Sequence, residues 1–225
     1  LKGEIMPRII RKRGFNGPTE WTFHDSQTDL HYQRIKAGFV PQGPYGGAIA
    51  VVAEQASIRP PAQMFLIGLV STSDIESTLH QVQTLKKDLR FDDLYGPVSD
   101  QNLNFIRLYN RQQRGRRLPT IQIQEVPDNE FAYNLAVLKQ TLTPAKQTLN
   151  LGEYSGQVKA ALQNIQRNEL NKVNYSDHPL IGALAIAAAI LVENVFYIMQ
   201  ERSYQIHNYN PINYKKNQPI GQKMN

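Results

Sequence analysis

Apolar and polar residues recur along this chain with different periods, and these periods predict where helices and strands lie. Ser73 and Glu76 form a capping-box pair, and the apolar residues behind them recur at helical spacing as far as Leu89. A second amphipathic pattern runs over residues 155–173. The segment EWTFHD alternates as a short strand does, and residues 61–70 have the length and composition of a buried strand. The sequence therefore mixes helices and strands.

Three further segments predict an antiparallel β-meander. They are LNFIRLYN at residues 103–110, TIQIQEV at 120–126 and FAYNLAVL at 131–138. In the last of these, Phe131 and Leu135 fall on one face of an alternating pattern. The connections are short, as in hairpins, so we expect the three strands to lie side by side.

The most apolar part of the chain is Leu180 to Met199, which reads LIGALAIAAAILVENVFYIM. Leu180 to Val192 is uninterrupted by charge, and a helix of that length spans about 20 Å, short of the roughly 30 Å of a bilayer core. Its apolar character on all sides predicts burial on all sides. Three interpretations remain open: a core helix, an interface between subunits, or insertion into a membrane. The residues proposed to carry this burial are Leu180, Leu184, Ile190, Leu191 and Phe196.

Together these patterns predict an α+β fold. We expect an antiparallel β-meander, two amphipathic helices and one strongly apolar C-terminal helix, with extended N- and C-terminal arms. Residues 1–20 are expected to be a basic arm, residues 21–202 a single domain that includes the apolar helix at 179–201, and residues 203–225 a polar tail.

Composition narrows the chemistry. The 225 residues contain no cysteine, which excludes disulfides, thiolate metal sites, iron–sulfur clusters and cysteine nucleophiles. The formal net charge of +6 points to polyanionic neighbours, namely nucleic acid, anionic lipid or acidic protein surfaces.

Basic residues gather in two clusters. The first lies in the N-terminal arm, and the second lies in RLYNRQQRGRR, which is expected to be a hairpin loop with Tyr109 nearby. Such clusters contact either the phosphates of a nucleic acid or the carboxylates of a partner subunit. The predicted contact residues are Arg8, Arg11, Lys12, Arg13, Arg107, Arg111, Arg114, Arg116 and Arg117.

The sequence offers no catalytic constellation. HDSQTDLH, with His24, Asp25, Asp29 and His31, has metal-ligating residue types but no standard ligand spacing. Residues 92–93 are adjacent aspartates of an acidic loop, and residues 43–48 are rich in glycine but lack the spacing of a phosphate-binding loop. We therefore expect no catalytic residues, no cofactor, no metal and no enzymatic activity.

The leading expectation is a non-enzymatic structural or assembly subunit of a large multi-protein complex. A virus or phage particle is the preferred setting, as a capsid, connector or tail component of an oligomer, with the virion or a large intracellular assembly as its location. Its partners would be other protein subunits, with nucleic acid possible and a membrane less favoured. One alternative is a nucleic-acid-binding protein that uses the arginine clusters. The other is a membrane-associated component anchored by the helix at 180–199.

Overall fold

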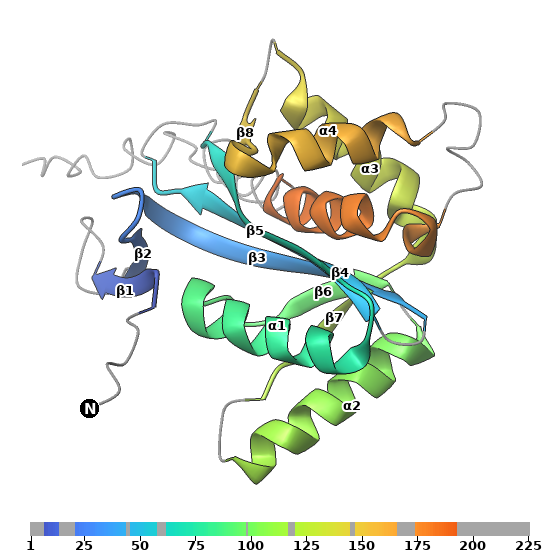
Figure 1. The fold of residues 1–225 in the computed structure, drawn as a ribbon. Coiled ribbons are helices and arrows are strands. Elements are labelled where there is room, and N and C mark those ends of the chain that lie inside the picture. The colour runs from blue at the N-terminus through green and yellow to red at the C-terminus, as the bar shows by residue number, and fades with distance from the viewer. Residues whose placement is uncertain are drawn as a thin grey trace, which may run out of the picture. The chain divides into compact units, whose positions relative to one another are not determined.

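A single eight-stranded sheet organises the part of the chain that the structure describes (Figure 1). The computed structural model describes residues 7–13, 21–43, 46–57, 62–97, 99–116, 120–144, 147–165 and 174–192. The strands are β1 (Ile9–Arg13), β2 (Trp21–Asp25), β3 (His31–Gln42), β4 (Gly46–Gln55), β5 (Met64–Thr72), β6 (Leu94–Pro97), β7 (Ile123–Val126) and β8 (Leu149–Asn150).

The sheet has an antiparallel part and a parallel part. Strands β1 to β5 pair antiparallel in the order of the sequence. β6 then pairs parallel with β3, β7 pairs parallel with β6, and β8 pairs parallel with β5. Helix α1 connects β5 to β6, and α2 connects β6 to its parallel neighbour β7, since parallel neighbours need a crossover connection.

Helices cover both faces of this sheet. They are α1 (Ile75–Leu89), α2 (Asp100–Gly115), α3 (Phe131–Leu142) and α4 (Ser155–Gln163), with short 3₁₀ turns at Asp128–Glu130, Gly152–Tyr154 and Tyr175–Asp177. Residues 179–192 are also helical. In Figure 1, α1 and α2 lie on one side of the sheet, whereas α3, α4 and the helix at 179–192 lie on the other.

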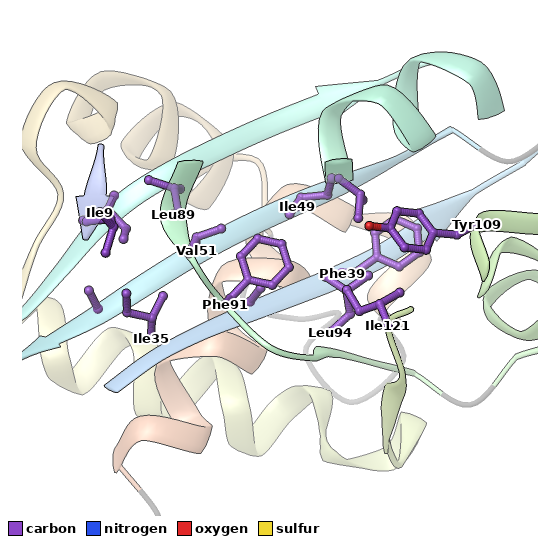
Figure 2. Close-up of a cluster of buried hydrophobic side chains, with 14 of the residues drawn as sticks. Ile9, Ile35, Phe39, Ile49, Val51, Leu89, Phe91, Leu94, Tyr109 and Ile121 are labelled. Carbon is purple, nitrogen blue, oxygen red and sulfur yellow. The ribbon is translucent and has the colours of Figure 1, made fainter. Parts of the chain in front are cut away.

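The core under α1 and α2 is formed by alternate residues of the central strands. Phe39 of β3 and Val51 of β4 face Leu89 of α1 and Tyr109 of α2 within one buried cluster (Figure 2). Because successive side chains of a strand point to opposite faces, the residues that alternate with these along β3 and β4 face the core on the other side of the sheet. The sheet is therefore buried on both faces along its centre.

The apolar helix at 179–192 packs directly on β3. A Cβ atom added at Gly38 would lie 2.0 Å from the carbonyl oxygen of Ala183, so only glycine permits this approach. At the far end, Arg34 of β3 donates from Nη2 to the carbonyl oxygen of Leu191 at 3.0 Å. The Tyr175 hydroxyl accepts from Asn134 Nδ2 of α3 at 2.7 Å. The described part of the helix is therefore covered by elements of its own chain, and no described helix is long and apolar enough to cross a membrane.

The α+β class is confirmed, and so is a mostly antiparallel sheet. The helix predicted to end near Leu89 is α1, although its N-cap is Asp74 rather than Ser73, with Asp74 Oδ1 accepting from the backbone N–H of Ser77 at 2.9 Å. The strands predicted at 20–25 and 61–70 correspond to β2 and β5.

The position of the predicted meander is wrong, because the antiparallel meander runs from β1 to β5. Residues 103–110 and 131–138 lie in helices α2 and α3, and only β7 is a strand in that region. In α3 the buried residues fall at helical spacing, from Phe131 to Asn134, Leu138 and Thr141, whereas Tyr133 is exposed. The aromatic residues and the partly alternating apolar pattern of this segment are also typical of a strand, so the sequence favoured one.

The predicted boundaries of arm, domain and tail stay predictions. Of residues 1–20, the described segment contains β1, which pairs along its whole length with β2. All described elements up to Leu191 lie in one compact unit, Leu1–Leu191. The tail at 203–225 lies outside the described residues.

Candidate functional site

Helix α2 has two faces of different character. Asn102, Phe105, Tyr109 and Gln113 are buried and recur every three or four residues, so they form the face that packs on the sheet. Ser99 caps the helix, with its Oγ accepting from the backbone N–H of Asn102 at 3.2 Å.

Three exposed arginines occupy the opposite face of α2. Arg107, Arg111 and Arg114 follow one another at spacings of four and three residues, which places them in one row on a helix. At about 1.5 Å of rise per residue the row is roughly 10 Å long. The exposed face therefore carries three positive charges over two helical turns.

The arginine row borders a shallow hollow of about 300 Å³. Ile106 and Asn110 complete its lining beside the three arginines. Asn110 is fixed by two bonds to one residue: its Nδ2 donates to the carbonyl oxygen of Ile121, and its Oδ1 accepts from the backbone N–H of Ile121, both at 2.8 Å. One wall of the hollow is thus held in place by the segment that leads into β7.

The charges of the arginine row are not neutralised within the described part of the chain. The ion pairs found there are Arg8–Asp25, His24–Asp29 and Arg34–Glu54, and none of them includes an arginine of α2. An exposed guanidinium row without carboxylate partners is a surface that attracts anions.

The N-terminal cluster is not part of this surface. Arg11 and Lys12 are exposed on β1, which also contains Arg13, and β1 lies away from α2 (Figure 1). Arg116 is exposed at the C-cap of α2, and Arg117 lies outside the described residues. The structure therefore brings together Arg107, Arg111 and Arg114.

Arg8 has a different environment from the other predicted contact residues. Its guanidinium binds the fully buried carboxylate of Asp25, with Nη2 2.7 Å from Oδ2, and also donates to the carbonyl oxygen of Ile67 at 3.2 Å. Burial alone would raise the pKa of Asp25, but the hydrogen bonds from Arg8 and the backbone of Gln27 outweigh it and hold that pKa below its usual value. Arg8 thus ties the N-terminal strand to the body of the fold.

The residues proposed for the apolar helix are mostly enclosed. Leu184 and Leu191 are fully buried, Leu180 and Ile190 are half-buried, and Phe196 lies outside the described residues.

His24, Asp29 and His31 come together at the start of β3. His24 Nε2 lies 2.8 Å from Asp29 Oδ1, and the two imidazole rings have centroids 4.8 Å apart. Within the described ranges, no group of three or more histidine, aspartate or glutamate side chains is arranged to hold a metal ion.

Sequence reasoning found the three arginines but not their arrangement, because it placed them on a hairpin loop. It also missed Ile106 and Asn110, which line the hollow. The spacing of Arg107, Arg111 and Arg114 was the available signal, since it forms one row only if the segment is helical.

Comparison with known proteins gives a distant structural likeness and no relative by sequence. No protein-family model and no curated protein matches the chain. The chain resembles a structure of RuvC from Thermus thermophilus, at 16% identity and a TM-score of 0.36, with 69% of this chain and 92% of that chain covered. It also resembles T. thermophilus RuvC in complex with Holliday junction substrate, at 13% identity and a TM-score of 0.38, with 69% and 91% covered.

These findings correct the expected function. The predictions of a structural or assembly subunit, of a virion component and of a protein without enzymatic activity are contradicted, since both neighbours are structures of RuvC and one of them holds a substrate. Neither comparison supports other protein subunits as partners. The expected location stays a prediction. At these TM-scores the likeness concerns architecture, and no residue role follows from it.

Proposed function

We propose that this protein binds nucleic acid through the exposed arginine row of α2. The observation that carries the proposal is the row itself: Arg107, Arg111 and Arg114 on one helical face, beside a hollow of about 300 Å³ and without carboxylate partners in the described chain. A nucleic-acid ligand is also consistent with the junction held by one of the RuvC structures.

Arginine suits this task for a geometric reason. Its planar guanidinium presents donors in a fixed fork that matches two oxygens of one phosphate, and it keeps its charge at any physiological pH. Three such side chains can neutralise about three phosphates, and each phosphate releases condensed counterions when it is neutralised. Binding should therefore weaken steeply as salt is added.

Removing part of the row tests the proposal. The double variant Arg107→Gln/Arg111→Gln removes two of the three charges, and the slope of log affinity against log salt should fall by about 1.8, at about 0.9 per phosphate of a duplex. Affinity is measured by fluorescence anisotropy of a labelled DNA duplex between about 50 and 200 mM salt.

A matched control separates the row from net charge. Lys139 of α3 and Lys159 of α4 are exposed on the opposite side of the sheet, so Lys139→Gln/Lys159→Gln makes the same change in net charge elsewhere. We expect this control to keep the wild-type slope. If both double variants keep the wild-type slope, or if both lower the slope by the same amount, α2 is not the binding surface.

A further inference from the structure

The aromatic residues of α2 do not reach the arginine surface. Phe105 is 1% exposed and Tyr109 is 2% exposed, and both point into the core. The ring of Phe105 lies 4.8 Å from that of Phe39 and 6.4 Å from that of Tyr109, measured between centroids. Figure 2 shows Tyr109 within the buried cluster. The expectation that Tyr109 would stand beside the arginines at the surface is therefore not met.

No other aromatic platform lies near the row within the described residues. The large hydrophobic side chains that are exposed there are Leu103 and Leu108, both on α2, and Tyr133, on α3 across the sheet. A leucine side chain has no π-face on which a base can stack. The surface beside the row consequently offers charge and aliphatic contact only.

The polar residue of the hollow cannot make a bidentate contact with a base. The amide nitrogen and the amide oxygen of Asn110 both bind the backbone of Ile121. Bidentate recognition of adenine by asparagine uses this same paired edge of the amide. The charged groups that line the hollow are the three guanidinium groups, which suit phosphates.

We infer that the arginine row accepts the phosphate backbone of a duplex in preference to a single strand; this inference rests on the proposed function. Proteins that bind single strands combine a basic groove with exposed aromatic side chains that stack on the bases, and α2 buries its aromatics. Where a protein contacts phosphates alone, the density of phosphate charge along the nucleic acid determines which ligand binds more tightly. A duplex presents the phosphates of two strands, with one charge per about 1.7 Å of helix axis, whereas a lone strand presents the phosphates of one strand only.

The size of the preference follows from counterion release. Each neutralised phosphate contributes about 0.9 to the salt slope on a duplex and about 0.7 on a single strand. For three arginines at about 0.1 M salt, this difference amounts to roughly fourfold in affinity.

The experiment uses the full chain with a 20-base-pair duplex of mixed sequence and with each of its strands alone. Fluorescence anisotropy at 0.1 M salt gives affinities that are compared per phosphate. We expect the duplex to bind about fourfold more tightly than either strand. In Arg107→Gln/Arg111→Gln the preference should shrink to less than twofold, whereas Lys139→Gln/Lys159→Gln should keep it.

The outcomes separate this inference from the function on which it rests. If a single strand binds as tightly as the duplex or more tightly, and the loss still maps to Arg107 and Arg111, the preference is refuted and nucleic-acid binding stands. If neither ligand binds, or if binding does not depend on these arginines, both the preference and the proposed function are wrong.

Discussion

The ion pair between Arg8 and Asp25 gives a prediction whose size follows from the structure. Three contacts join the two groups: Nε to Oδ1 at 3.0 Å, Nε to Oδ2 at 3.1 Å and Nη2 to Oδ2 at 2.7 Å. The Asp25 side chain is 0% exposed and that of Arg8 is 16% exposed. Arg8→Met keeps a long apolar stem but removes the charge, so the variant leaves a buried carboxylate without its cation.

Removing one partner of a buried ion pair costs about 3–5 kcal/mol of stability. Donors to Asp25 remain in the variant, among them the backbone N–H of Gln27 at 2.9 Å from Oδ1, the Tyr32 hydroxyl at 3.3 Å from Oδ2 and the Thr28 side chain. Because these donors still solvate the carboxylate, we expect a loss at the low end, about 3 kcal/mol.

The loss should depend on pH. In the wild-type protein the pKa of Asp25 is lowered, so its contribution to stability is present at neutral pH and is lost as the pH falls through that lowered pKa. In Arg8→Met the cation no longer opposes burial, so the pKa of Asp25 should rise above its usual value. The deficit of the variant is therefore largest at neutral pH and shrinks on acidification, as the carboxyl group takes up a proton.

Urea denaturation at pH 7 and pH 4.5 measures the free energy of unfolding at both points. Lys12→Met is the control, because Lys12 is an exposed cation on the same strand and should change stability by less than about 0.5 kcal/mol. A deficit for Arg8→Met below about 1 kcal/mol at pH 7, or one that is equal at both pH values, would refute the proposed role of the ion pair.

Two further predictions concern packing and protonation. Gly38→Ala places a Cβ atom 2.0 Å from the carbonyl oxygen of Ala183, which is backbone and cannot yield, so the free energy of unfolding measured with heat or urea should fall by at least about 1–3 kcal/mol. The control is Gly156→Ala on α4, where an added Cβ meets nothing within 4 Å and the free energy of unfolding should rise by up to about 1 kcal/mol. An equal change in the two variants would contradict the tight contact at Gly38. Burial, followed by the charges of His24 and Lys12, lowers the pKa of His31. The stability linked to this residue should therefore be present above about pH 6.5 and decline as the pH falls below that value. An NMR titration of the imidazole resonances that gave an unshifted pKa for His31 would contradict this.

The sequence alone determined those elements in which the capping residues, the apolar spacing and the composition all indicate the same structure. The capping residues and apolar spacing of α1 pointed to a helix, and the apolar run of β5 pointed to a buried strand. Residues 103–110 and 131–138 were misassigned because apolar and polar residues do not separate cleanly between the two faces of these helices. In α2 the apolar Leu103 and Leu108 are exposed, and in α3 the polar Asn134 is buried, so the distribution of apolar residues concealed the helical period.

Whether the arginines form one surface depended on the assignment of residues 103–110 to a strand or to a helix. The sequence determined that Arg107, Arg111 and Arg114 are close along the chain, but only the helix makes them one row, and only the packing of Phe105 and Tyr109 decides that the row lacks an aromatic neighbour.

The apolar segment shows the same division between sequence and structure. Its composition by itself required burial on all sides, because each large apolar side chain gains free energy when it leaves water. What would bury it was open from sequence, since lipid, another subunit and the chain's own sheet can each supply an apolar surface. Gly38 decides this for residues 179–192: the missing side chain on β3 leaves room for the helix backbone at Ala183, and that fit between distant parts of the chain exists only in the folded structure.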